Sequence, residues 1–96
     1  MMNAWPIGIG SIVISKAGRD RGRLFLVVAE VDDDFVMVAN GALRKLDRPK
    51  KKRRKHLKPT GRVCGELRSR LAEGGSVEDH ELRTWLSEEE EKLVQV

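Results

Sequence analysis

The chain has 96 residues, of which 40% are hydrophobic and 35% are charged, so it can form one domain or one small domain with an appendage. The single cysteine, Cys64, excludes an intramolecular disulfide and is compatible with a reducing compartment. The first ten residues contain no charged n-region, and no apolar run approaches the ~20 residues of a membrane span. We therefore expect a cytoplasmic protein with no membrane partner.

The net charge of +4 is unevenly distributed along the chain. Residues 1–60 carry 14 Lys and Arg against 6 Asp and Glu, a net +8, whereas residues 61–96 carry 5 against 9, a net −4. A basic front half of this kind favours a polyanionic partner.

Short β-branched and apolar runs predict strands in the first 60 residues, separated by turns rich in Gly, Asp and Asn. The predicted strands are 11–15, 24–31 and 35–39, followed by an edge strand at 42–46 and a short strand at 55–58. Strands this close together leave no room for parallel crossovers. We expect a small antiparallel barrel, because closure removes exposed sheet edges.

The predicted strand 24–31 is apolar on both faces. One face carries Phe25, Val27, Ala29 and Val31, and the other carries Leu24, Leu26 and Val28. The barrel interior can cover one face, and the C-terminal segment is the candidate cover for the other. The alternative is that this segment swings free or docks on another protein.

The C-terminal segment, residues 61–96, is predicted to be an acidic helical extension of the barrel formed by residues 1–60. Val63, Leu67 and Leu71 have helical spacing, and two glycines at 74–75 end that helix. Ser76 and Asp79 indicate an N-cap for a second helix. Its apolar stripe consists of Leu82, Trp85, Leu86 and Leu93.

The sequence does not predict an enzyme, a metal site, a cofactor or a small-molecule substrate. His56 lies among cations, which disfavours its protonation, and its spacing from Cys64 or His80 does not suggest a nucleophilic pair. The three carboxylates at 32–34 are typical of a tight turn rather than a metal site.

The cations form two basic stretches. Lys16, Arg19, Arg21 and Arg23 lie in the loop 16–23, and ten of the fifteen residues at 44–58 are Lys or Arg, against one Asp. A solvated surface normally mixes both signs, so these stretches favour phosphates as counter-charge. We expect them to form one continuous basic rim; the alternative is two unrelated solvated loops.

Few aromatic residues are placed to read bases. Phe25 and Phe35 lie in predicted core strands, and Trp85 lies on the helical stripe. Trp5 is expected to pack over one end of the barrel. We therefore expect recognition of the backbone and shape of folded RNA rather than base reading.

Residues 9–28, IGSIVISKAGRDRGRLFLVV, resemble the KOW motif, which has a strand, a loop ending in a basic–Gly pair, and an apolar strand. Gly22 stands at the position of the motif's signature glycine, where a backbone angle closed to other residues and a close approach to a partner are possible. Residues 40–60 extend the likeness to bacterial KOW-domain RNA-binding proteins, which are similar to single-KOW large-subunit ribosomal proteins of archaea and eukaryotes. The resemblance covers roughly residues 8–60.

This resemblance implies a mainly β fold, a small SH3-like (KOW) antiparallel barrel of about five strands, here followed by a C-terminal helical hairpin. It implies binding to RNA, commonly structured ribosomal RNA, with the ribosome or ribosomal proteins as further partners and a role in translation. The implied RNA-binding residues are Lys16, Arg19, Arg21, Arg23, Arg44, Lys45, Lys50, Lys51, Lys52, Arg53, Arg54, Lys55, His56 and Lys58. We expect Lys50–Lys55 to be a long, mobile loop, with Arg44, Lys45 and Lys58 in ordered strands.

Other functions stay open at this point. The chain can be a protein-interaction module of the transcription or translation machinery that docks through Leu82, Trp85 and Leu86. The segment PKKKRRK also fits a nuclear-import signal. Membrane-surface binding is disfavoured because no amphipathic apolar segment flanks the basic run.

Overall fold

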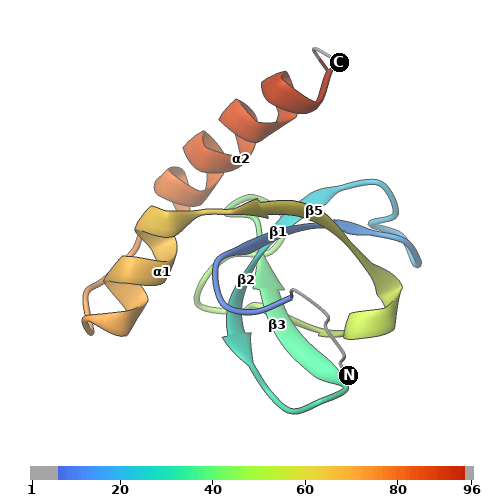
Figure 1. The fold of residues 1–96 in the computed structure, drawn as a ribbon, viewed down its shortest axis with the longest axis horizontal. Helices are drawn as coiled ribbons and strands as arrows, with labels where there is room; N and C mark the ends of the chain where they lie inside the picture. The colour runs from blue at the N-terminus through green and yellow to red at the C-terminus, as the bar shows by residue number, and fades with distance from the viewer. Residues whose placement is uncertain (1–6, 95–96) are drawn as a thin grey trace.

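The computed structural model describes residues 7–94, with side chains described through Lys92. It contains five strands and two α-helices (Figure 1). The strands are β1 (Ser11–Ser15), β2 (Leu24–Glu30), β3 (Phe35–Ala39), β4 (Lys50–Arg53) and β5 (Leu57–Val63). The 3₁₀ helix η1 (Arg54–His56) joins β4 to β5, and the α-helices are α1 (Gly65–Ala72) and α2 (Asp79–Val94). Within the described residues, no helix is long and apolar enough to cross a membrane.

The strands form one antiparallel sheet in the order β4-β3-β2-β1-β5. Four of them follow one another as a meander, and β5 returns to pair with β1 at the other edge. The sheet is strongly curved (Figure 1). The predicted mainly β fold with a C-terminal helical hairpin is therefore confirmed at this level.

The concave side of the sheet holds the first of two hydrophobic clusters. Val13, Phe25, Val27, Val36 and Val38 form it together with Ile7 and Leu57, and each of these side chains is at most 3% exposed. Alternate residues of β1, β2 and β3 contribute, as the period of a strand requires.

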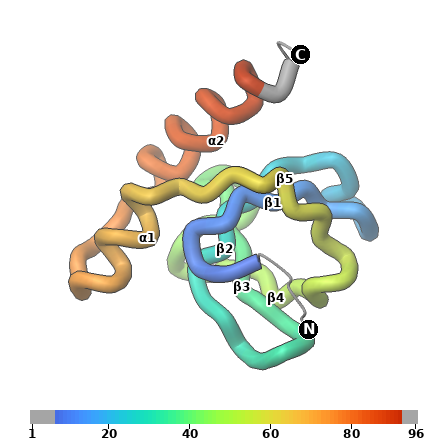
Figure 2. Tube along the Cα trace, in the orientation of Figure 1, coloured from blue at the N-terminus to red at the C-terminus, as the bar shows by residue number. Residues whose placement is uncertain are grey.

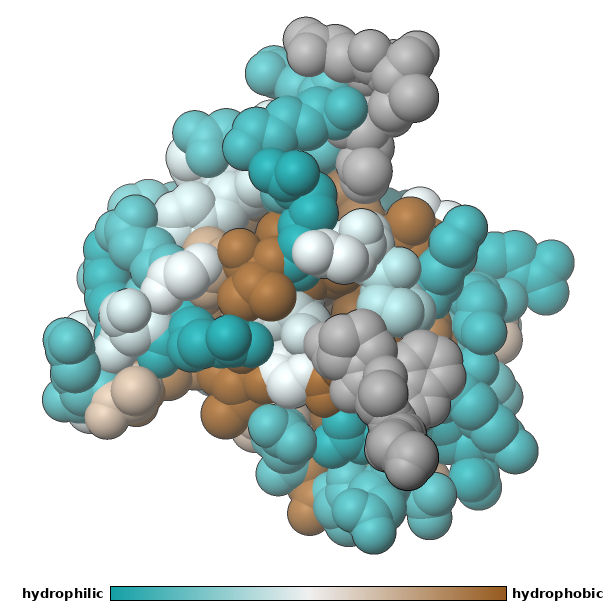
Figure 3. Space-filling view, in the orientation of Figure 1, coloured by the Kyte–Doolittle hydropathy of each residue, from teal (hydrophilic) through white to brown (hydrophobic). Residues whose placement is uncertain are grey.

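The opposite face of the sheet is covered by the helices. Leu24 and Leu26 of β2 pack with Leu67 of α1 and with Leu82 and Leu86 of α2 in a second cluster of buried residues. Figure 2 shows both helices on one side of the sheet, and Figure 3 shows hydrophobic residues between helices and sheet. The prediction that the helical hairpin covers the second face of this strand is confirmed.

Several predicted boundaries are wrong by a few residues. Val63 ends β5 instead of starting a helix, and it is 45% exposed. The second helix begins at Asp79, where the Glu81 carboxylate accepts a hydrogen bond from the backbone N–H of Glu78, so the cap is not made by Ser76. The β2 register shifts between Val27 and Ala29, and Val31 lies beyond the strand and is 45% exposed.

The edge strand predicted at 42–46 is a turn. The Asn40 side chain explains it, because its Oδ1 accepts hydrogen bonds from the backbone N–H groups of Ala42 and Arg44, each at 3.0 Å. Asp79 at the start of α2 then accepts a bond from the N–H of Leu46 at 2.8 Å. These local and long-range contacts replace the strand ladder.

The turn at 32–34 is confirmed. Asp32 Oδ1 accepts the backbone N–H groups of Asp34 and Phe35, each at 2.8 Å. These two hydrogen bonds lower the pKa of Asp32. The predictions for Trp5 and for the Leu93 side chain concern positions outside the described residues.

Candidate nucleic-acid interface

The six consecutive cations at 50–55 do not form a loop. Lys50–Arg53 make up the edge strand β4, which pairs with β3, and Arg54 and Lys55 begin η1. The prediction of a mobile loop is wrong, because partners elsewhere in the chain neutralise or cover several of these side chains.

The pairing of β4 with β3 divides its cations between two faces. Lys50 and Lys52 lie opposite Val38 and Val36, whose side chains belong to the inner cluster. Lys51 and Arg53 lie opposite Met37 and Phe35 on the outer face. Alternation along the strand thus gives neighbouring residues different surroundings.

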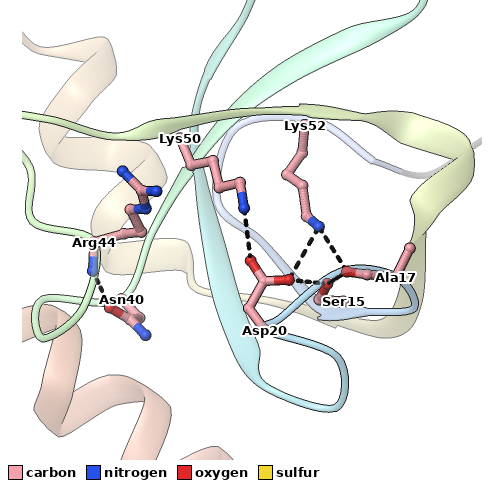
Figure 4. A network of polar contacts seen from close by, with 7 residues as sticks. All are labelled: Ser15, Ala17, Asp20, Asn40, Arg44, Lys50 and Lys52. Carbon is pink, nitrogen blue, oxygen red and sulfur yellow. Dashed lines mark hydrogen bonds and ion pairs between the residues drawn. The ribbon is translucent and has the colours of Figure 1, made fainter.

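On the inner side, Asp20 of the loop 16–23 binds both lysines (Figure 4). Lys52 Nζ lies 3.1 Å from Asp20 Oδ1 and 3.1 Å from the carbonyl oxygen of Ala17, and Lys50 Nζ lies 3.4 Å from Asp20 Oδ2. The Ser15 hydroxyl donates to Asp20 Oδ1 at 2.7 Å. The two basic stretches of the sequence are therefore brought together through one carboxylate.

Asp20 is only 8% exposed, and its surroundings keep it ionised. Burial raises the pKa of a carboxyl group, but here the hydrogen bond from Ser15 and the contacts with Lys52 and Lys50 outweigh it and lower the pKa of Asp20 to about 2. Lys52 is buried as well, with 7% of its side chain exposed. This pair holds the loop against β4 and is not free to bind a ligand.

On the outer side, Lys51 and Arg53 lie over one aromatic ring. Lys51 Nζ is 4.6 Å and Arg53 Cζ is 4.9 Å from the centroid of Phe35, distances at which a cation is attracted to the ring face. Both cations are exposed. They are held in place without a carboxylate and keep their charge available.

Arg54 has a structural role. Its guanidinium donates to the carbonyl oxygens of Ile7 and Asp32 and pairs with Glu30 at 3.0 Å. It thus ties the start of the described chain and the β2–β3 turn to the end of β4. His56 is half-buried, and its carbonyl oxygen accepts the N–H of Lys16.

The remaining candidate cations are exposed, and no carboxylate among residues 7–94 forms an ion pair with them. Figure 3 shows hydrophilic residues over the end of the molecule where the loop 16–23 and η1 lie. These free cations are Lys16, Arg19, Arg21, Arg23, Arg44, Lys45, Lys51, Arg53, Lys55 and Lys58. Arg44 and Lys45 lie in a turn and not in the predicted strand, whereas Lys58 lies in β5.

A groove separates the loop 16–23 from the turn that precedes β4; we call it the basic groove. Its volume is about 450 Å³. The residues that line it are Arg19, Asp20, Arg23, Phe25, Leu43, Arg44 and Lys50. Four cations thus surround one carboxylate that Lys52 already neutralises.

Gly22 lies in the loop 16–23, between the groove residues Asp20 and Arg23, but does not itself line the basic groove. Its φ of +87° lies in the left-handed region that favours glycine, and its N–H donates to the Ser15 carbonyl at 2.8 Å. A side chain at this position would meet no atom within 4 Å, so the surface beside it is open to a partner.

Sequence reasoning missed two residues of this surface. Asp20 organises it, and the signal was available, since Asp20 is the single acid among the four cations of the loop 16–23. Leu43 borders the groove and is 63% exposed. No sequence signal identifies Leu43, because its position depends on the Asn40 turn.

The apolar face of α2 proposed for protein docking is largely buried within the protein. Leu82 is fully buried, Leu86 is 7% exposed, and Trp85 is half-buried against the second cluster. The Arg70 guanidinium lies 5.7 Å from the centroid of the Trp85 ring.

Within the described part of the chain, no group of three or more His, Cys, Asp or Glu side chains is arranged to hold a metal ion. A scan against protein-family models finds no match, and a search among curated proteins finds none either. The geometry of the basic surface is thus the main basis for assigning a function.

Proposed function

We propose that the protein is a non-catalytic RNA-binding module that contacts the phosphate backbone of structured RNA through the loop 16–23, the turn before β4, and the exposed cations of β4 and η1. The KOW resemblance of residues 9–28 extends this proposal to an SH3-like barrel and to ribosomal RNA as the ligand. The sheet order, with β1 between β2 and β5, is compatible with such a barrel.

One observation carries the proposal. Asp20 joins the loop 16–23 to β4, so that cations about 30 positions apart in sequence share one surface. Lys52, which is buried and does not line the basic groove, neutralises the Asp20 carboxylate. The exposed groups are left with excess positive charge, and self-repulsion makes such a surface costly without a counter-charge.

Phosphates supply that counter-charge. Each phosphate that a Lys or Arg neutralises releases condensed counterions, which drives binding and makes it depend on salt. Arginines add hydrogen bonds that match phosphate oxygens in pairs. Because the cations are spread over a loop, a turn and a strand, they can follow a backbone.

The alternative of a protein-interaction module finds less support. It requires the apolar stripe of α2 as its interface, but Leu82 and Leu86 are buried against β2. Only the half-buried Trp85 is left partly accessible, and Arg70 lies over its ring. No feature of the described residues favours that function over RNA binding.

The test is binding to a structured ribosomal RNA fragment and to an unstructured RNA of equal length across a salt series. If about five phosphates are contacted, log K falls with log salt with a slope of roughly −3.5 to −4.5. We expect a steep slope and tighter binding to the structured RNA. A flat response, or no binding, would contradict the proposal.

Two double variants with equal loss of charge locate the interface. Arg19→Gln/Arg21→Gln removes two exposed cations of the loop and should reduce the slope by about 1.5. Arg68→Gln/Lys92→Gln removes two cations from the helices and should leave the slope unchanged. An equal effect of both variants would mean that net charge alone drives binding.

A further inference from the structure

We infer that the basic groove is a pocket for one unpaired nucleotide of the bound RNA, an inference that rests on the proposed function. Its cations hold the phosphate, and its apolar and guanidinium surfaces receive the base. This adds recognition of an unpaired base to the backbone contacts that the exposed cations make elsewhere.

The chemical lining of the groove suits a nucleotide better than a bare phosphate. Three of its four cations are arginines, whose planar guanidinium groups stack on bases as well as bind phosphates. Leu43 adds exposed apolar surface, whereas Phe25, of which only 1% is exposed, contributes little. Leu43 is one of three large hydrophobic side chains exposed among the described residues, and the other two, Val31 and Val63, do not line this groove.

The charge of the groove also suits a phosphate. Its one carboxylate, Asp20, is bound by Lys52 at 3.1 Å and by the Ser15 hydroxyl at 2.7 Å. Lys52 does not line the groove, so it neutralises Asp20 without occupying the groove. Lys50 also pairs with Asp20, at 3.4 Å, so Arg19, Arg23 and Arg44 are the groove cations left to face an anion.

The backbone of both walls of the groove is held by hydrogen bonds within the protein before any ligand binds. In the loop, the N–H of Arg23 donates to the Asp20 carbonyl at 3.0 Å, and Asp20 is anchored to β4. In the turn, Asn40 Oδ1 holds the N–H of Arg44 at 3.0 Å, and the Arg44 carbonyl accepts the N–H groups of Asn40 and Gly41. A preformed pocket binds without the cost of ordering its walls.

The size of the groove is consistent with this occupant. Its volume of about 450 Å³ falls within the roughly 300–1,000 Å³ usual for small-ligand sites. A continuous RNA duplex keeps its bases stacked and presents only backbone and groove edges. A base can reach this pocket only where the RNA has a bulge, a loop or an end.

The test compares two RNA hairpins of equal length, one fully paired and one with a single unpaired nucleotide in its stem. We expect the wild-type protein to bind the bulged hairpin about tenfold more tightly. The triple variant Arg19→Lys/Arg23→Lys/Arg44→Lys keeps the charge but removes all three guanidinium planes of the groove, so it should abolish this preference and leave the salt slope unchanged. Arg48→Lys is the control, since Arg48 is exposed in the same turn but does not line the groove.

Three results would overturn the inference. Equal binding of both hairpins with a steep salt slope would exclude the nucleotide pocket and leave backbone binding intact. A preference that survives the triple Arg→Lys variant would place the base elsewhere on the surface. Absence of binding to either hairpin would contradict the proposed function itself, and the inference with it.

Discussion

The two faces of β4 differ although their residues alternate in one run of like charges. On the inner face, Lys50 and Lys52 bind a buried carboxylate and join two parts of the fold. On the outer face, Lys51 and Arg53 lie over Phe35 and stay exposed. A basic run therefore cannot be assigned a single role, because strand alternation separates cations that stabilise the fold from cations that can bind a ligand.

Removing the ion pair on the inner face of β4 should have the largest effect on the free energy of unfolding. Asp20→Ala leaves the buried Lys52 ammonium without its carboxylate, and removing one partner of a buried ion pair costs about 3 kcal/mol or more. We expect the free energy of unfolding, measured with urea, to fall by about 3 kcal/mol.

Glu66→Ala is the matched control for the Asp20 variant. It also removes a carboxylate from an ion pair, with Arg70 at 3.1 Å, but the Glu66 side chain is 64% exposed. We expect almost no change in stability. Equal losses for the two variants would mean that the inner pair is no more important than a surface pair.

The pH dependence of stability should report the same inner pair. The pKa of Asp20 is about 2 in the folded protein against 3.8 for a free Asp, so the folded state favours the ionised form. This contribution is fully present above pH 4 and is lost as pH falls towards 2, an expected loss of about 2 kcal/mol.

The measurement is urea unfolding of the wild type and of Asp20→Asn at several values between pH 5 and pH 2. Other carboxylates, such as Asp32, titrate in both proteins and cancel in the difference. The stability advantage of the wild type should shrink by about 2 kcal/mol on acidification. An advantage that is constant with pH would show that Asp20 is not the group that titrates.

These effects also separate what the sequence could predict from what it could not. Strands with a strong apolar signal, such as Phe35–Ala39, were located correctly, and the two apolar faces of Leu24–Glu30 correctly required a helical cover. Both signals are local in sequence. Lys50–Arg53 was missed as a strand because its stability depends on Asp20, 30 or more positions away.

For the candidate site, too, local signals could be predicted from the sequence and long-range contacts could not. Composition and charge identified the two basic stretches, and Gly22 was correctly expected to need an unusual backbone angle. Three features could not be predicted, because they depend on strand register and on long-range contacts. They are the separation of the cations onto two faces of β4, the structural role of Arg54, and the groove beside Leu43. A single sequence carries no direct signal for these.

Changing the outer face should affect RNA binding more than stability. Lys51→Gln/Arg53→Gln removes two exposed cations and their contacts with Phe35, and we expect unfolding to become easier by less than about 1 kcal/mol. If each cation contacts one phosphate, the salt slope decreases by about 1.5 and affinity near 0.15 M salt falls about tenfold.

Lys52→Gln, on the inner face of β4, should affect stability more than RNA binding, the opposite of the outer-face variant. It removes one cation from the same strand, but we expect it to lower stability first, since Asp20 then loses its closest cation. The salt slope of the fraction that remains folded should change little. A slope that drops as much as for the outer variant would show that Lys52 also reaches the RNA.

The smallest expected effect concerns the ring between the outer cations. Phe35→Leu keeps an apolar side chain but removes the ring face beneath Lys51 and Arg53, which should cost about 0.5–1 kcal/mol of stability. Combining it with Lys51→Gln/Arg53→Gln in a double-mutant cycle isolates the cation–ring term. RNA affinity should change less than about twofold, since both charges remain. A much larger loss of affinity would indicate that a base stacks on Phe35, and the outer face would then read bases as well as backbone.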